Sequence, residues 1–462
     1  MSIFNFRKRP AGYGGEEKAE TYDFFEIAAF FRCDSHKQAL GVLSEQTCSD
    51  LGLDDLFMFT DRTASRVGQQ YLYNLMRTIP ANEGEIKANE AIIEKFSADS
   101  GGHVSVVKEL HTLQAVEAYS IAPLLQTEHP PVSAWWQFVL RVCSLLPTLF
   151  LLLFLFYKLV PALLLLVVAI LVNGVLHYRN KHNGLGYLVS MPQLMKMLDA
   201  AGKLAADPLL FVISKKGPEA LASLETLRRS SKSLRIESRL DNDLAVILWA
   251  ITEIIKIFFL IEPLSYNKTV RLLKDKNAAI ETVFRFIGLA DSLSSVAFLR
   301  KGLPSYCLPE QPDGEVRVEA DGMYHPLVEN CVPNAIGIQG RSVLFTGSNM
   351  SGKTTFIRTL GVNILVAQTL NTAFARRMRL QMPVMIHAAL MLSDSLSDGK
   401  SFYMKEVESI RDMLSYSQSE QTNLFLLDEI FKGTNTTERI AAAKAVLSFL
   451  NTSRNIVVVS TH

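Results

Sequence analysis

The sequence predicts an α/β domain with a parallel sheet at its C-terminal end, preceded by an α-helical region that a hydrophobic hairpin interrupts. Three observations lead to this fold class. After Pro304, short apolar runs alternate with helical patterns, an order typical of parallel strands joined by helical crossovers. A glycine-rich loop separates one such run from the helix that follows it. Two long and nearly uncharged segments lie within the helical region, and their composition is that of membrane spans.

Length and composition limit the class of protein. The 462 residues are enough for two or three domains, and 48% apolar with 20% charged residues can build hydrophobic cores. The formal net charge is +1, so no overall basic field favours nucleic acid. Five scattered cysteines without a C-x-x-C pair predict reduced thiols in a cytosolic setting. A signal peptide is not expected, because no apolar run follows the basic residues near the N-terminus.

Changes of pattern along the chain predict five parts. Thr60–Met76 spaces its apolar residues at intervals of three and four, as an amphipathic helix does, and Ala88–Phe96 continues as a helix. The stretch after Pro304 changes to turns and short strands. We therefore expect a flexible tail at 1–20, a helical region at 21–134, a hydrophobic hairpin at 135–180, a second helical region at 181–303 and an α/β domain at 304–462.

The hairpin is predicted from the segment Val142–Tyr178, whose one formal charge is Lys158. A single helix over this segment would measure about 55 Å, well beyond the roughly 30 Å hydrocarbon core of a bilayer. Two transmembrane spans at about 138–156 and 159–176, joined by a turn at Lys158, fit that thickness better. The alternative is a buried helical hairpin in a water-soluble core, which the runs that are apolar on every side disfavour.

Aromatic and basic residues flank the two apolar segments. Trp135 and Trp136 precede the first segment, and Arg179 and Lys181 follow the second. These residue types are enriched where a helix passes through a membrane interface. Because a hairpin returns the chain to the side that it left, both flanking regions are expected on one side of the membrane.

Two further stretches carry weaker signals. Leu244–Leu260 is apolar, but it is only about 17 residues long and contains Glu253 and Lys256. We therefore expect a core helix there and not a third span. Lys215–Arg239 is basic on balance, which fits either a solvated helix face or contact with phosphates or anionic lipid headgroups.

The glycine-rich loop has the spacing of a phosphate-binding loop. Gly347-x4-Gly352-Lys353-Thr354 follows the apolar run at 342–346 and matches the P-loop pattern without a mismatch. Its glycines let successive backbone N–H groups face a phosphate, and the following helix adds its positive N-terminal end. Lys353 is expected to reach the β- and γ-phosphates, and Thr354 to ligate Mg2+. The residues expected to bind nucleotide are Gly347, Ser348, Asn349, Met350, Ser351, Gly352, Lys353, Thr354 and Thr355.

A second apolar run, at 423–427, ends in two carboxylates. Asp428 is expected to hold the Mg2+ shell, and Glu429 to polarise the attacking water. Alone, this pattern also fits a buried strand that ends in a solvated acidic turn. Its place after a complete phosphate-binding loop favours the catalytic interpretation, so the sequence predicts an ATPase with ATP and Mg2+ as its cofactors.

The elements around these motifs have the order of a parallel sheet with helical crossovers. A first strand is expected at 315–320. Further strands are expected near 342–346, 383–390, 423–427 and 455–460, and helices near 353–370, 401–418 and 436–450.

Five motifs over 320–462 resemble, in the same order, those of the MutS family of DNA mismatch-repair ATPases. They are His325–Val328, the loop Thr346–Thr355, the loop and helix Ser393–Glu406, the run Asp428–Thr436 and the C-terminal Val457–His462. A weaker similarity over Asp61–Ile79 and Glu85–Phe96 resembles the helical core domain of that family. The resemblance implies an ABC/MutS-like P-loop ATPase domain preceded by a core-like helical region.

The resemblance also implies roles that spacing does not supply. Asn349 would contact the γ-phosphate side of the nucleotide, and Ser401 would reach the nucleotide of a second subunit in a composite dimer. His462 would sense the γ-phosphate and complete the hydrolytic site with Glu429 and Lys353. Because a helix N-terminus favours an anion, the role of Ser401 is physically reasonable. Its position at the start of a helix also fits a simple N-cap.

Together these inferences predict a membrane-anchored MutS-like ATPase that works as a homodimer. Two spans would anchor it, with the N-terminal and ATPase regions in the cytoplasm. About 50 residues precede the core-like region, so a mismatch-recognition domain is not expected, and DNA is left open as a partner. The alternative is a membrane mechano-ATPase, or a nucleotide-dependent scaffold with slow turnover, that has no role on DNA.

Overall fold

The structure of this chain is a computed structural model that describes part of the sequence. The described residues are 18, 20–37, 39–81, 84–125, 133–207, 210, 217–230, 243–261, 263–264, 273, 275–312, 314–339, 342–348, 351–390, 402–431, 435–452 and 454–461. Most of the expected tail at 1–20 lies outside them, and so do residues 215–216 and 231–239 of the basic stretch Lys215–Arg239.

The chain divides into two compact units, and each is described by itself. Unit 1 contains Met1–Ala64, Gly68–Val107 and Leu289–His462. Unit 2 contains Ser65–Val67 and Lys108–Gly288. The α/β domain and the N-terminal helices therefore belong to one unit, and the hydrophobic hairpin belongs to the other.

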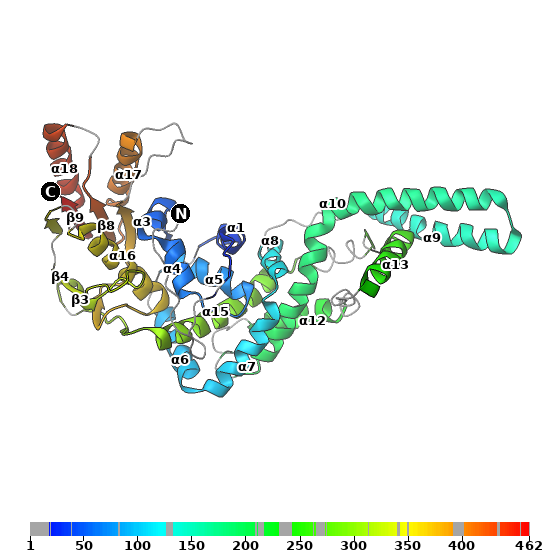
Figure 1. Ribbon diagram of the computed structural model, residues 1–462, viewed down its shortest axis with the longest axis horizontal. Helices are drawn as coiled ribbons and strands as arrows, with labels where there is room; N and C mark the ends of the chain where they lie inside the picture. Colours follow the sequence, from blue (N-terminus) through cyan, green and yellow to red (C-terminus); the bar gives the residue numbers. More distant parts are fainter. Residues whose placement is uncertain are drawn as a thin grey trace. The chain divides into compact units, whose positions relative to one another are not determined.

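Unit 1 contains a four-stranded parallel sheet in the order β5-β9-β8-β7 (Figure 1). Its strands are β5 (Val343–Thr346), β7 (Met385–Ala389), β8 (Asn423–Asp428) and β9 (Asn455–Thr461). The crossover helices are α16 (Lys353–Leu370), α17 (Phe402–Tyr416) and α18 (Thr436–Leu450). The expected strands and helices of the α/β domain are thus confirmed, because each apolar run does form a strand at the expected place. Strands β7, β8 and β9 are buried, whereas β5 is half-buried to exposed.

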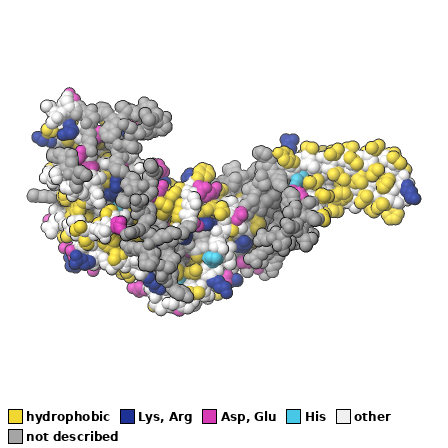
Figure 2. Space-filling model, in the orientation of Figure 1, with side chains coloured by type: hydrophobic (Ala, Val, Ile, Leu, Met, Phe, Trp, Pro, Cys, Tyr) yellow, Lys and Arg dark blue, Asp and Glu magenta, His cyan; other side chains and the backbone are white. Residues whose placement is uncertain are grey.

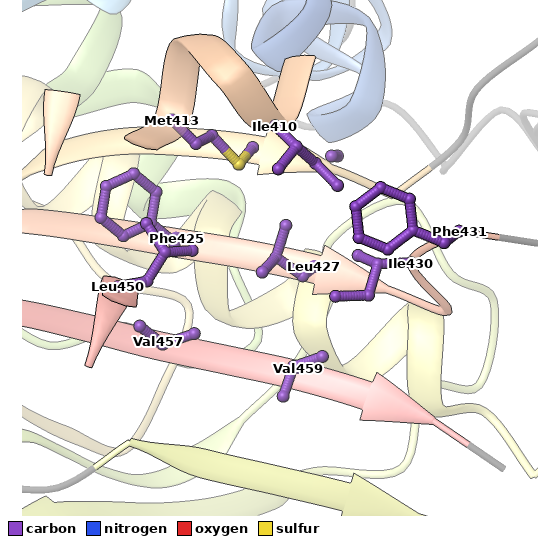
Figure 3. Packing of buried hydrophobic residues seen from close by; sticks show 10 residues of the cluster. Ile410, Met413, Phe425, Leu427, Ile430, Phe431, Leu450, Val457 and Val459 are labelled. Carbon is purple, nitrogen blue, oxygen red and sulfur yellow. The ribbon is translucent and has the colours of Figure 1, made fainter. Parts of the chain in front are cut away.

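The core of this domain lies between the sheet and its helices. Figure 3 shows Leu427 of β8 and Val459 of β9 pointing into a cluster to which α17 and α18 contribute. Burying a side chain of this size contributes roughly 1.5–3 kcal/mol. The buried members of the cluster are Ala389, Ile410, Met413, Phe425, Leu427, Ile430, Phe431, Leu450, Val457 and Val459.

A second, three-stranded antiparallel sheet has the order β4-β3-β6. Its strands are β3 (Val316–Met323), β4 (Asn334–Gln339) and β6 (Arg377–Leu380). The sequence analysis predicts only β3. The other two strands are short, and β4 carries mostly exposed or half-buried residues, so they have no apolar alternation that pattern reasoning could detect.

The N-terminal part of unit 1 is mainly helical. Its elements are α1 (Phe24–Ile27), α2 (Ala29–Cys33), β1 (Ala39–Val42), α3 (Glu45–Leu51), α4 (Leu53–Thr60), α5 (Arg66–Arg77), β2 (Thr78–Pro80) and α6 (Gly84–Ala98). The helix expected at Thr60–Met76 begins later, at Arg66. The carboxylate of Asp61 accepts a hydrogen bond from the backbone N–H of Thr63 at 2.9 Å, and this local turn delays the helix.

Unit 2 is helical in its described parts. Its elements are η1 (His111–Leu113), η2 (Val116–Ser120), α8 (Ile121–Leu124), α9 (Ala134–Tyr157), α10 (Val160–Leu204), α12 (Gly217–Ser230) and α13 (Asp243–Phe259). The division between the units falls within α7 (Ser100–Leu110) and within α15 (Asn277–Gly302).

Helices α9 and α10 form the predicted hairpin (Figure 1). The chain turns at Lys158, which has a φ of +52° and closes α9 with a hydrogen bond from its N–H to the carbonyl of Phe154 at 2.8 Å. The second helix does not end near 176 as expected, because α10 continues unbroken to Leu204. Figure 2 shows hydrophobic side chains covering the projecting part of the hairpin.

Three described helices are long and apolar enough to cross a membrane, by length and composition alone. They are Ala134–Tyr157, Val160–Arg179 and Asn277–Gly302, whose apolar windows are 17%, 28% and 78% buried. The first two correspond to the predicted spans. The third is covered by protein, and its fully buried Asp291 accepts a hydrogen bond from the backbone N–H of Ala64 at 2.8 Å. A helix packed in this way has little surface left for lipid.

The expectation of a core helix at Leu244–Leu260 is wrong for the described side chains of α13. Ile251, Ile254, Ile255 and Phe259 are all exposed in the structure. A core helix would bury such residues.

Candidate functional site

The glycine-rich loop connects β5 to the first turn of α16. Gly352 has a φ of +87°, a backbone conformation that residues with a Cβ rarely adopt. The Nζ atom of Lys353 donates hydrogen bonds to the carbonyl oxygens of Gly347 at 2.7 Å and Ser348 at 3.0 Å. The loop therefore curls around a cation next to the N-terminus of α16, where an anion is favoured.

Three side chains meet at the carboxyl ends of β8 and β9. The hydroxyl of Thr354, in the first turn of α16, donates a hydrogen bond to one carboxylate oxygen of Asp428. The hydroxyl of Ser460 donates to the other oxygen of the same carboxylate. This arrangement follows from the register of the parallel pair, because Asp428 lies directly beside Ser460. Asp428 is thus oriented from both sides.

The backbone turns sharply after Asp428. Glu429 has a φ of +45° and Phe431 a φ of +62°, both in the left-handed region. The N–H of Glu429 donates to the carbonyl of Ser460 at 3.0 Å, and the N–H of Phe431 donates to the carboxylate of Glu406 on α17. Non-glycine residues in this conformation cost free energy and are often found at functional sites. Here the two hydrogen bonds hold the turn that carries Glu429.

A buried arginine lies behind the site. Arg358 is one turn after Thr354 on α16, and its Nε donates to the backbone carbonyl of Asp50 on α3 at 2.7 Å. Burial lowers the pKa of Arg358, and the negative charges of Asp50 and Asp428 oppose this shift. Burial also lowers the pKa of His325 to about 4, with a further contribution from the charge of Arg358. His325 is therefore neutral at physiological pH.

The described donors fit a nucleotide with a magnesium ion. Among the described residues, no group of three or more His, Cys, Asp and Glu side chains could hold a metal ion by itself. Mg2+ does not need one, because it usually takes one or two protein oxygens together with phosphates and waters. Thr354 and Asp428 supply two such oxygens, already joined by a hydrogen bond.

Several predicted site residues lie outside the described part of the chain. They are Asn349, Met350, Ser401 and His462, and their roles stay predictions. The structure does bring Lys353, Thr354 and Asp428 together, through the loop, α16 and β8. Gly347, Ser348, Ser351, Gly352 and Thr355 belong to the described loop and first helical turn.

The sequence analysis missed three residues of this neighbourhood. Ser460 lies within the predicted motif Val457–His462 and Glu406 ends the motif Ser393–Glu406, but the sequence predicts no role for either side chain. It predicts no role for Arg358 either. The position of Ser460 can be found by aligning the ends of two parallel strands. A buried charge on a helix, such as Arg358, has no signal in the sequence.

A parallel sheet with a lysine-closed phosphate-binding loop and a strand-end aspartate beside it defines a P-loop nucleotide-binding domain. Residues 343–462 match the family described as MutS domain V, which includes this whole arrangement. Residues 343–462 therefore form a domain of the MutS family.

Individual relatives agree with the family match. The chain is 32% identical over 183 residues to the DNA mismatch repair protein MutS of Haloquadratum walsbyi, covering 38% of this chain and 19% of the relative. It is 35% identical over 141 residues to that of Thermus aquaticus, covering 30% and 17%. It is 31% identical over 189 residues to Endonuclease MutS2 of Thermus thermophilus, covering 40% and 25%. The matches thus span only 17% to 25% of the length of these relatives.

Proposed function

We propose that this chain is a membrane-anchored MutS-like ATPase that hydrolyses ATP to ADP and phosphate with Mg2+. The observation that carries the proposal is the pairing of Thr354 with Asp428 beside the lysine-closed loop. The match to MutS domain V supports it, because that domain is a P-loop ATPase domain. ATP and Mg2+ supply the reactive phosphate and the charge that offsets its negative oxygens.

The roles of the residues follow from their positions. Lys353 and the loop N–H groups bind the phosphates, with Gly352 allowing the close approach of the backbone. Thr354 and Asp428 hold the metal, and Ser460 keeps the carboxylate of Asp428 oriented. Glu429 orients and polarises the attacking water, held on its turn by the hydrogen bond to Ser460. We keep Asn349 and Met350 as nucleotide contacts, and His462 as the sensor of the γ-phosphate.

We further propose that two copies form the working unit. The MutS relatives and the position of Ser401 before α17 support a composite site in which Ser401 of one subunit reaches the nucleotide of the other. Hydrolysis would then open and close the helical region that the hairpin anchors. The hairpin α9–α10 supports a membrane location, because its large apolar side chains are exposed in the structure. Two spans would leave the regions before and after the hairpin in the cytoplasm, where ATP is available.

Two kinds of target are consistent with this chemistry. The names of the relatives, DNA mismatch repair protein and endonuclease, favour DNA. The exposed apolar hairpin and the net charge of +1 favour a mechanical role at the membrane without DNA. Salt dependence separates the two, because DNA binding through phosphates weakens steeply as salt rises.

The test is ATP turnover by the detergent-purified full chain, with and without duplex DNA. Lys353→Ala should abolish turnover by removing the phosphate-binding cation, whereas Lys444→Ala on the exposed face of α18 should leave it unchanged. Glu429→Gln should retain ATP binding and lose hydrolysis. Normal hydrolysis by Glu429→Gln would show that the catalytic role is misassigned. A several-fold and salt-sensitive rise with DNA would support a DNA role, and clear turnover that DNA leaves unchanged would support the membrane role.

A further inference from the structure

From Ile251 to its end at Phe259, where its side chains are described, helix α13 has the opposite polarity to that of a helix on a water-soluble protein. Its apolar residues Ile251, Ile254, Ile255 and Phe259 are between 42% and 65% exposed. The side chains of its charged pair, Glu253 and Lys256, are both 18% exposed. Helices on soluble proteins turn their apolar face to the core and their charges to water. Lipid is the medium in which exposed isoleucines and enclosed charges are both stable.

The enclosed polar groups of α13 join it to the hairpin. Asn173 of α10 is 1% exposed, and its Nδ2 donates to the carbonyl of Cys143 on α9 at 3.2 Å and to that of Phe258 on α13 at 3.0 Å. His177, one turn further along α10, has its Nε2 at 3.3 Å from a carboxylate oxygen of Glu253. Polar side chains often link helices within membranes in this way. We call these groups, Asn173, His177, Glu253 and Lys256, the polar seam.

The exposed face of α13 lies beside the apolar surface of the hairpin. All three helices belong to unit 2, and α13 packs against both α9 and α10 (Figure 1). On α10 the neighbouring Leu171, Val172 and Val175 are exposed as well. A membrane that surrounds the hairpin would therefore also meet α13.

The polar seam indicates how deeply α13 would enter the hydrocarbon core of the membrane. The apolar part of α10 ends at Arg179, which is expected at the membrane interface. His177 and its partner Glu253 then lie near the headgroups. Asn173 is six residues before Arg179, or about 9 Å along the helix. Phe258, which Asn173 contacts, therefore lies about 9 Å inside the hydrocarbon core.

The arrangement of the chain excludes a full crossing by α13. Both ends of the segment Lys108–Gly288 continue into unit 1, so this segment must cross a membrane an even number of times. Helices α9 and α10 account for two crossings. Among the described residues, the candidate span that follows α13 is α15, and its apolar window is 78% buried and so is not open to lipid.

We propose that α13 is a third membrane-embedded helix, inserted into one leaflet beside the hairpin without crossing it. Its face formed by Ile254, Ile255 and Phe259 contacts phospholipid acyl chains, Ile251 lies at the level of the headgroups, and the polar seam fixes the helix to α9 and α10. The proposal rests on the membrane anchoring proposed above. It assigns α13 a place in the region that ATP turnover is proposed to move.

Photo-crosslinking to lipid tests this placement. The full chain is reconstituted in phosphatidylcholine nanodiscs with p-benzoylphenylalanine at Ile254, at Leu164 of the hairpin or at Met404 of α17, all exposed positions. Mass spectrometry then detects lipid adducts after irradiation. We expect adducts at Leu164 and Ile254, and none at Met404. In the Ile254 variant, adding Asn173→Leu should reduce the adduct several-fold by breaking the polar seam, while the same change should leave the adduct at Leu164 intact.

The outcomes separate the two proposals. An adduct at Leu164 without one at Ile254 overturns the placement of α13 and leaves the membrane hairpin in place. No adduct at Leu164 overturns the membrane anchoring itself. An equal adduct at Ile254 with and without Asn173→Leu contradicts the fixing role of the polar seam.

Discussion

The carboxylate of Asp50 accepts a hydrogen bond from the backbone N–H of Leu390 at 2.9 Å and so joins α3 to the end of β7. One turn earlier, the hydroxyl oxygen of Thr47 accepts from the N–H of Ala388 at 3.2 Å. Strand β7 is an edge strand of the parallel sheet. Its N–H groups that point away from β8 would otherwise lack a partner. The N-terminal helix α3 therefore completes the edge of the nucleotide-binding sheet.

Loss of this link should destabilise unit 1. Asp50→Ala leaves the N–H of Leu390 without its acceptor and removes a negative charge close to the buried Arg358. We expect a loss of about 2–4 kcal/mol in the free energy of unfolding, because an unsatisfied buried donor and an uncompensated charge are both costly. Guanidinium denaturation measures it. Asp50→Asn keeps an acceptor oxygen and should lose clearly less; equal losses for the two variants would contradict the role of the hydrogen bond.

Ser460 should affect the metal more than the nucleotide. Its hydroxyl donates to the carboxylate of Asp428, so Ser460→Ala leaves that carboxylate less well oriented. We expect the Mg2+ concentration for half-maximal ATP turnover to rise about tenfold, the low end of the effect of losing a hydrogen bond to a metal ligand. Titration of Mg2+ at saturating ATP measures this change. Ser415→Ala, on α17, is the control, and an unchanged Mg2+ requirement in Ser460→Ala would argue against the proposed metal site.

The sequence was sufficient for most of the nucleotide-binding domain, for physical reasons. Strands β7, β8 and β9 are buried on both faces and have apolar sequences, and the loop after β5 needs glycine and lysine at fixed spacing. Ser460 was missed because a hydroxyl in a strand acquires meaning only when the register sets it beside Asp428. Ser401 and His462 lie outside the described residues, so the roles predicted for them stay predictions.

The sequence predicted less of the helical regions than of the nucleotide-binding domain. The turn at Lys158 could be predicted, because two apolar segments meet there. The polarity of α13 could not, because Glu253 and Lys256 in an apolar stretch fit either a core helix or a membrane helix. Which side these charges face depends on Asn173 and His177, which are far away in the sequence.

Gly361 should tolerate no side chain. A Cβ at this position of α16 would lie 2.5 Å from a methyl carbon of Leu426 on β8 and 2.7 Å from one of Leu51 on α3. Gly361→Ala should therefore lower the melting temperature, although alanine favours a helix by about 1 kcal/mol over glycine. In Gly101→Ala in α7, the new Cβ would lie 3.6 Å from a carboxylate oxygen of Asp99, so this change should leave the melting temperature unchanged or raise it. A rise in both variants would mean that α16 can move away from the sheet.

Acid should destabilise unit 1 through its buried histidines. Burial lowers the pKa of His387 to about 4, against an ordinary value of 6.5, so between these values the unfolded chain binds a proton that the folded chain does not. Stability therefore falls as pH falls through this window. His387→Phe keeps the ring stacked on Tyr416 and Phe425 but loses the contact with Asn423. We expect a cost of about 1 kcal/mol at pH 7.5 and a fall in stability between pH 7.5 and 5 that is about 1–2 kcal/mol smaller.

Denaturation curves at the two pH values measure this difference. His103 and His325 have pKa values lowered to about 4 in the same way, so part of the acid sensitivity should remain in His387→Phe. An acid-induced loss equal to that of the parent chain would contradict the protonation of His387 on unfolding.

The ion pair of Arg300 with Glu90 lies where the helical part of unit 1 meets its nucleotide-binding domain. One Nη of Arg300 lies 2.9 Å from a carboxylate oxygen of Glu90 on α6 and also donates to the carbonyl of Asn371 at 2.9 Å. The Nε donates to the hydroxyl of Thr372 at 3.0 Å. Asn371 ends α16, the helix that begins at Lys353, so this pair joins α15 and α6 to the far end of the P-loop helix.

Arg300→Met should lower the free energy of unfolding by about 3–5 kcal/mol, because it leaves the carboxylate of Glu90 buried without its counter-ion. Glu90→Gln should cost less, since Asn371 can still donate to the amide oxygen at this position. The double variant removes both charges together, so its loss should be about 2 kcal/mol smaller than the sum of the single losses. Guanidinium denaturation of the four chains completes the cycle. If the losses simply add, the two side chains act independently, and Arg300 stabilises this region through its hydrogen bonds to Asn371 and Thr372 and not through Glu90.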